Sequence, residues 1–224
     1  CGGRRTGMKF GWTWTVLILV AACSGPARAI TGAEVIERME ERFAKAKTYS
    51  ATFEKQFFWS VLDRNMSREG RIFTRRPRQF RVEVEDGDLV IADGEAIWVY
   101  NKANQQVIVA PYEDELRTPW EILVEYADGY TPVSVAETEL DGTDAYVVIL
   151  QPRPEAPPNL QVQRLRVWVG RKDWDLLQVE QLEANDDIRT YVLSEHRRNK
   201  KLGDELFVFS PPEGVEIIDR RRPD

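Results

Sequence analysis

The chain has 224 residues, enough for one domain of sandwich or barrel type, and it shows no internal repeat that would indicate a second. Its 31 Lys and Arg residues are outnumbered by 37 Asp and Glu, for a formal net charge of −6. Because proteins that bind nucleic acid neutralise phosphates with clustered cations, this balance argues against a nucleic-acid partner.

The N-terminal stretch has the features of a secretory signal. A start at Met8 is followed by an apolar run over Val16–Ala22 and by a small-x-small cleavage site at Ala27–Ala29. The apolar run is too short to span a bilayer permanently. We therefore interpret residues 1–29 as a leader and predict that residues 30–224 form a single soluble domain after export.

Processing of the leader at a second site would give the protein a different location. Val20–Cys23 resembles a bacterial lipobox, whose processing would leave the chain acylated at Cys23 and anchored to a membrane. Cleavage after Ala29 is favoured, because the first predicted helix begins directly afterwards and leaves little tether. Four cations and no acid lie in residues 1–29, so this form keeps 27 basic and 37 acidic residues, a net charge of about −10. It retains neither cysteine, and therefore has no disulfide and no thiol nucleophile.

An amphipathic helix is predicted at the start of the domain. Thr31–Glu34 has the pattern of a capping box, in which the hydroxyl and the carboxylate each bind a free amide of the first turn. Ile36, Met39 and Phe43 then recur at helical spacing among charged residues. We expect about four turns packed on a sheet; the alternative is a movable lid over an apolar cavity.

From Tyr49 the hydrophobic period changes to two, which is typical of strands. Along residues 49–59 one face carries Tyr49, Ala51, Phe53, Phe57 and Trp59, interrupted by Lys55. A polar loop is expected over residues 63–68, followed by a strand from Gly70 to Thr74. That strand ends at Pro77, which has no amide to give to a ladder.

The stretch from Gly70 to Tyr100 reads as four short alternating segments. Pro77 and the dipeptides Asp86–Gly87 and Asp93–Gly94 separate them, and Asp-Gly is a strong hairpin signal. The pattern predicts a meander of antiparallel strands. Asp93 is interpreted as a turn former, because its side chain can bind the backbone that follows.

A second capped helix is predicted at Thr118–Glu121. Thr118 is the cap and Pro119 takes the first helical position. The helix carries Trp120, Ile122 and Leu123, and it is too short to be stable alone, so we expect it to lean on the sheet.

The rest of the chain continues the strand pattern. Further strands are predicted at residues 105–110, 133–140, 145–151, 160–169, 176–183, 188–194 and 215–219. Arg197–Lys201 is interpreted as a solvated turn. The predicted fold is mainly β (α+β): a single curved antiparallel sheet or unclosed half-barrel of about 11 strands, with an N-terminal amphipathic helix and a short second helix as lid.

Catalytic groups are scarce. His196 is the only histidine and is interpreted as a surface imidazole; no serine lies in a nucleophile elbow and no glycine-rich loop follows a strand. We therefore predict a protein that is not an enzyme and has no cofactor and no metal; a hydrolase built on two carboxylates is the remote alternative. Aromatic residues are instead abundant, and about eleven strands enclose more volume than two short helices fill, which favours a ligand cavity.

Short motifs in a fixed order resemble the LolA family of periplasmic outer-membrane lipoprotein carriers. In chain order they are Ser50–Gln56 after the first helix, Gly70-x-Ile72 leading into Arg75–Pro77, Phe80-Arg81, Asp93-Gly94 ahead of Ile97–Tyr100, Gln105–Val107, Thr118-Pro119 and Phe207–Val215. The resemblance implies an unclosed antiparallel barrel lidded by helices. It also implies a periplasmic shuttle that accepts acylated lipoproteins from an inner-membrane ABC release complex and passes them to an outer-membrane receptor. We expect the protein to act as a monomer.

Site residues follow from the same resemblance. Arg76 matches the family arginine that bonds to the lid and tunes its opening. Val82 stands where the family commonly has Trp, and Asp86–Gly87 where it has a proline, which affects cavity shape. The acyl-cavity candidates are Ile36, Met39, Phe43, Phe53, Phe57, Phe80, Val82, Val84, Trp98, Tyr100, Trp120, Ile122 and Leu123.

Within that set Phe80, Val82, Val84, Trp98 and Tyr100 are predicted to form an acyl-facing wall, with the choice between the two faces of these strands left open. A second hypothesis keeps the half-barrel but makes it a membrane-anchored lipoprotein receptor or lipid-sensing envelope protein, acylated at Cys23.

Overall fold

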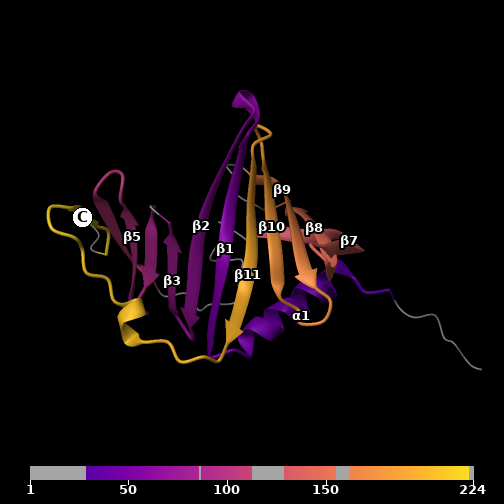
Figure 1. Cartoon of the computed structure of the whole chain (residues 1–224), viewed down its shortest axis with the longest axis horizontal. Helices are drawn as coiled ribbons and strands as arrows, with labels where there is room; N and C mark the ends of the chain where they lie inside the picture. Colours follow the sequence, from indigo (N-terminus) through magenta and orange to yellow (C-terminus); the bar gives the residue numbers. More distant parts are fainter. Residues whose placement is uncertain (1–28, 86, 113–128, 155–161, 222–224) are drawn as a thin grey trace, which may run out of the picture.

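The computed structural model describes residues 29–85, 87–112, 129–154 and 162–221. In these parts of the chain one α-helix, α1 (Gly32–Ala44), accompanies a single unclosed sheet of twelve strands (Figure 1). The strands are β1 (Thr48–Trp59), β2 (Arg64–Arg75), β3 (Gln79–Val84), β4 (Leu89–Ala92), β5 (Ala96–Asn101), β6 (Gln106–Pro111), β7 (Tyr130–Leu140), β8 (Thr143–Pro152), β9 (Val162–Gly170), β10 (Leu176–Glu183), β11 (Ile188–Arg198) and β12 (Glu216–Asp219). Their order across the sheet is β12-β6-β5-β4-β3-β2-β1-β11-β10-β9-β8-β7. The predicted mainly β fold with one unclosed sheet is confirmed.

The predicted capping box starts α1. The Thr31 amide donates to Glu34 Oε2 at 2.8 Å, and the Glu34 amide donates to Thr31 Oγ1 at 3.2 Å. At the same end a Cβ on Gly32 would lie only 3.0 Å from the Cβ of Pro132 on β7. Glycine thus allows the first turn of α1 to lie close against β7. Neither α1 nor another helix in the described parts has the length and apolar content needed to cross a bilayer.

One face of the sheet carries Tyr49, Ala51 and Phe53 of β1, and we call it the inner face. The three side chains are buried, and α1 packs on the same face. The helix lies along the β7–β11 part of the sheet, away from β3 and β5 (Figure 1). Its buried residues are Val35, Ile36, Met39 and Phe43.

The prediction of a polar loop over residues 63–68 is wrong. A short 3-10 helix, Ser60–Leu62, and a left-handed Asp63 make the turn, and β2 begins at Arg64. Every residue from Arg64 to Arg75 pairs with β1. The polar side chains are tolerated because this hairpin projects beyond the neighbouring strands, where both of its faces meet solvent (Figure 1).

The prediction of about eleven strands is close to the number found, whereas the expectation that all of them are antiparallel is wrong. The described residues form twelve, and β12 runs parallel to β6. Between β11 and β12 the chain passes through a 3-10 helix, Asp204–Phe207, instead of a tight turn. A long connection does not impose the reversal of direction that a hairpin does, so the last strand can enter the sheet in either sense.

The second predicted helix at Thr118–Glu121 lies outside the described residues. The same is true of the cavity candidates Trp120, Ile122 and Leu123, and of Asp86 in the first Asp-Gly turn.

Candidate functional site

The inner face is a continuous apolar surface that runs from β8 to β5. Residues directly opposite each other in an antiparallel sheet share a face, so the strand register shows which side chains belong to it. Across β2, β3, β4 and β5 the inner row is Ile72, Val82, Val90 and Val99, and a second row is Thr74, Phe80, Ala92 and Ile97. This surface is the best candidate for a hydrophobic binding site in the described parts of the chain.

Burial differs between the two halves of this face. Under α1, side chains such as Val148, Val167 and Val179 are fully buried. On β3 and β4, Val82 and Val90 pack against the same cluster but stay half-exposed. The apolar strip over β3–β5 is therefore partly open at Val82 and Val90, whereas Phe80 and Ala92 in its second row are buried.

Five of the predicted cavity residues lie together beneath or beside α1. Ile36, Met39 and Phe43 of the helix are buried with Phe53 of β1, and Phe80 of β3 joins the same cluster. Val82 and Val84 pack against it from the edge. Phe57 lies further along β1, toward the hairpin, and remains half-exposed.

The predicted wall of Phe80, Val82, Val84, Trp98 and Tyr100 is not one surface. Trp98 is opposite Ile91, whereas the inner-face partner of Ala92 is Ile97. Trp98 and Tyr100 therefore point to the outer face, where both contact Phe209 with ring centroids 5.6 and 6.1 Å apart.

The outer position of Trp98 follows from the Asp93 turn. One carboxylate oxygen, Oδ1, accepts the amides of Glu95 and Ala96, both at 2.8 Å, and Oδ2 accepts the Trp98 indole at 2.9 Å. Asp93 is thus the turn former that was predicted. Sequence reasoning missed Ile97 and Val90 as inner-face residues, because it followed the larger aromatic side chains instead of the register set by this turn.

Arg76 connects the meander to α1. Its guanidinium carbon lies 5.1 Å from the centre of the Phe43 ring, near the C-terminal end of the helix. Phe43 in turn packs edge-on against Tyr49, with centroids 5.3 Å apart. The backbone amide of Arg76 donates to the carbonyl of Lys47 at 3.0 Å, in the segment that joins α1 to β1. A change in the position of α1 would alter the two contacts that Phe43 makes.

His196 is not the surface imidazole that was predicted. Its Nδ1 is hydrogen-bonded to the Tyr49 hydroxyl at 2.8 Å, and the side chain is largely enclosed. Burial lowers the pKa of His196 below its ordinary value of 6.5, against the opposing effects of a backbone hydrogen bond with Leu193 and the charge of Asp173. The imidazole supports the packing at the end of α1.

The predicted solvated turn at Arg197–Lys201 is wrong for its first two residues. Both belong to β11, and the Arg198 guanidinium forms an ion pair with Asp175 in which both side chains are mostly buried. Asn199 ends the strand and accepts the Lys47 amide at 2.9 Å through its side chain. Long-range pairing with Tyr49 and Ser50 of β1, which local composition does not reveal, extends the strand.

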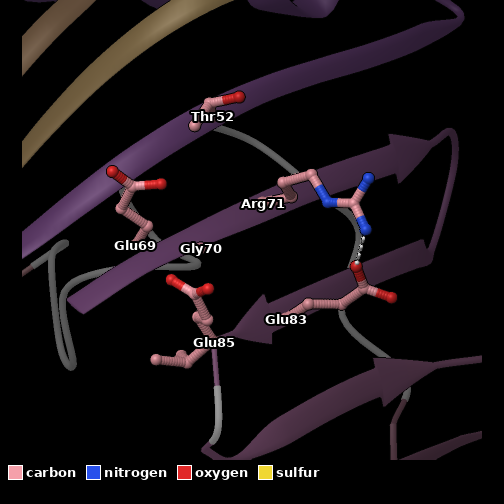
Figure 2. Close-up of a pocket in the computed structure, with 7 residues that line it drawn as sticks. Thr52, Glu69, Gly70, Arg71, Glu83 and Glu85 are labelled. Carbon is pink, nitrogen blue, oxygen red and sulfur yellow. Dashed lines mark hydrogen bonds and ion pairs between the residues drawn. The ribbon is translucent and has the colours of Figure 1, made fainter.

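A hollow of about 380 Å³ with several charged side chains in its lining lies on the outer face (Figure 2). Its charged lining is Glu69, Arg71, Glu83 and Glu85, and Arg71 Nη2 lies 3.0 Å from Glu83 Oε2. These side chains alternate with the inner-face residues of β2 and β3; Val84, which also lines the hollow, packs against the inner cluster. Among the described residues no group of His, Cys, Asp and Glu is arranged to hold a metal ion.

Comparison with known proteins agrees with this geometry. The family model described as "Outer membrane lipoprotein carrier protein LolA" matches residues 44–210, which include β1 to β11 and the segment that packs on Trp98. The chain belongs to the LolA family. The matched region includes the inner rows of β2–β5 as well as Arg76.

Relatives extend the match over most of the chain. An outer-membrane lipoprotein carrier protein from Histophilus somni (strain 2336) is 26% identical over 218 residues, covering 96% of this chain and 100% of the relative. The protein of the same name from Salmonella paratyphi A is 23% identical over 215 residues, covering 92% and 98%.

Solved structures resemble the fold. An uncharacterized conserved protein from Thermus thermophilus has a TM-score of 0.56 at 14% identity, over 84% of this chain and 98% of that one. MucB has a TM-score of 0.51 at 14% identity, over 84% of this chain and 65% of that one. At these identities the likeness concerns the fold alone.

Proposed function

We propose that this LolA-family protein is a periplasmic lipoprotein carrier, and not an enzyme, that holds the acyl chains of its cargo on the inner face. The observation that carries the proposal is the half-exposed apolar strip on β3–β5, continuous with a core that α1 closes. Each methylene buried there contributes about 0.8 kcal/mol, so even partial burial offsets much of the cost of moving an acylated protein through water.

Helix α1 acts as the lid in this proposal. It is held by Arg76 over Phe43 at one end and by the close contact of Gly32 with β7 at the other. Entry of acyl chains competes with the packing of Ile36, Met39 and Phe43 on the sheet. Release requires that the open and closed arrangements differ by only a small free energy, because a carrier that binds too tightly does not transfer its cargo.

The partners follow from the same proposal. Cargo would arrive from an inner-membrane ABC lipoprotein-release complex and leave to an outer-membrane lipoprotein receptor, with the carrier acting as a monomer. Residues 1–29 would be removed at Ala29 to release the soluble form.

Substitution of Arg76 tests the lid. Arg76→Leu removes the charged group that contacts Phe43, so the variant should retain bound lipoprotein and pass it on more slowly to receptor-bearing membranes. The matched control is Arg78→Leu, two residues along, because Arg78 forms no hydrogen bond or ion pair with described residues. Transfer is followed by the amount of a radiolabelled lipoprotein that remains with the carrier over time. Equal transfer by both variants and the unaltered protein would contradict the lid role.

The lipobox at Val20–Cys23 supports a second candidate, a receptor or lipid-sensing protein anchored through Cys23. Mass spectrometry of the N-terminal peptide of the exported protein distinguishes the two. A free N-terminus at Ile30 supports the carrier, whereas a diacylglyceryl group on Cys23 supports the anchored form.

A further inference from the structure

Three cations are grouped on the inner face, near the β1–β2 hairpin. Lys55 of β1 follows Phe53 on the same face, and the register places Arg68 of β2 directly opposite it. Arg189 of β11 is opposite Phe57, one step further along the same face. Directly opposite residues have Cβ atoms about 5 Å apart, so Lys55 and Arg68 can reach one small group together.

Lys55 is half-buried without a neutralising contact. Its ammonium lies 5.8 Å from the centre of the Tyr191 ring, and it makes no hydrogen bond or ion pair with the residues that the structure describes. Burial lowers the pKa of Lys55, and the nearby charges of Arg189 and Arg68 lower it further, while Asp88 opposes them. A cation in such a place is costly unless an anion binds beside it.

The acids near these cations are concentrated around Arg189. Glu183 pairs with Arg189 at 2.7 Å, and Asp88 lies near Lys55. Arg68 forms no ion pair within the described parts of the chain. Asp187 also acts on Arg189. Lys55 and Arg68 are therefore left with only the nearby charge of Asp88 to balance them, on a protein whose formal net charge is −6.

A buried hydrogen-bond donor close to these cations also lacks an acceptor. Gln181 of β10 is directly opposite Arg189 and is only 2% exposed, yet its Nε2 has no hydrogen-bond partner in the described structure. An unpartnered buried donor costs on the order of 1–3 kcal/mol, and proteins rarely leave one without a reason. This observation is independent of the charges. It indicates that the region around Arg189 has too few acceptor oxygens.

We propose that Lys55 and Arg68 bind the anionic phosphate of a lipid head group, with the hydrocarbon of the same molecule lying along Phe57 and the apolar strip. The proposal rests on acyl binding by the inner face and extends the range of that face to glycerophospholipids. Phosphate offers several acceptor oxygens, which suits two cations of different shape better than a single carboxylate does. A free phosphate shares this chemistry but would gain nothing from the aromatic and apolar neighbours.

The experiment compares three probes by calorimetric titration below their critical micelle concentrations. They are palmitoyl lysophosphatidylglycerol, neutral monopalmitoylglycerol and inorganic phosphate. The unaltered protein should bind the anionic lipid about tenfold more tightly than the neutral one, since hydrogen bonds to charged groups are the stronger ones. Lys55→Gln and Arg68→Gln should each remove most of this preference and leave the affinity for monopalmitoylglycerol unchanged. Lys102→Gln, an exposed position in the β5–β6 turn, is the matched control.

The outcomes separate this inference from the proposed function. If the anionic and neutral lipids bind equally, or if both variants keep the preference, the head-group site is refuted while acyl binding stands. If neither lipid binds, the proposed function fails as well. If inorganic phosphate displaces the anionic lipid at equal concentration, the site belongs to free phosphate and the lipid assignment is overturned. Arg68 is exposed, so its variant retains a folded protein even if Lys55→Gln does not, and circular dichroism checks both.

Discussion

The two halves of the inner face are built from the same kinds of side chain but are buried to different degrees. Under α1, residues such as Val148 and Val179 are fully enclosed by helix and sheet. Over β3–β5, Val82 and Val90 have the same alternation and chemistry, yet they remain half-exposed. The difference indicates that one sheet can form a stabilising core where it is covered and a partly open apolar surface around Val82 and Val90.

The largest effect is expected in the covered half. Phe53→Ala would remove a side chain that is 1% exposed and packs against Tyr191, with ring centroids 6.0 Å apart. The loss of buried area and the cavity left behind should cost about 3–5 kcal/mol of unfolding free energy, measured by urea titration. Stability within about 1 kcal/mol of the unaltered protein would show that this half is not the stabilising core.

The open half should respond in binding more than in stability. Val82→Glu places a charge in the apolar strip, and the affinity for monopalmitoylglycerol should fall at least about tenfold, while stability falls by about 1 kcal/mol because the site is only half-buried. Ile217→Glu is the control, since Ile217 is opposite Val107 on the outer face and is 51% exposed. A stability loss as large as that of Phe53→Ala would erase the distinction between the halves.

An outer-face turn provides the next test. Asp93→Ala removes an acceptor from two backbone amides and from the Trp98 indole. We expect a loss of about 1–2 kcal/mol in unfolding free energy and no change in monopalmitoylglycerol affinity. A clear loss of affinity would mean that the outer face takes part in binding.

The smallest effect concerns pH and again lies in the covered half. The folded-state pKa of His196 is lowered by burial, so the unfolded chain binds the proton more readily. The contribution of the neutral His196 side chain to stability is complete above its unfolded-state pKa of 6.5. It is lost as pH falls from there toward the lower pKa of the folded state. His196→Gln should flatten this part of the profile in urea titrations at successive pH values. An unchanged slope would show that other groups are responsible.

Much of the fold could be predicted because its signals are local. The capping box at Thr31, the helical spacing of Met39 and Phe43, and the period of two from Tyr49 each depend on neighbours along the chain. The Asp93 turn was identified for the same reason. Failures occurred where distant segments decide the outcome: β2 extends through polar residues because β1 pairs with them, and β12 is parallel to β6.

The same distinction between local and long-range information applies to the candidate site. By itself the sequence determined which segments are helices and strands, the turn at Asp93, the family, and the importance of apolar and aromatic residues. These features depend on the spacing and composition of residues along the chain. Only the tertiary structure decided which face each residue takes. Trp98 lies on the outer face instead of the predicted acyl-facing wall, and His196 is hydrogen-bonded to Tyr49 instead of being a surface imidazole. Lys55 belongs to a group of cations. These outcomes depend on register and on the placement of α1, which arise from pairings between strands far apart in the chain.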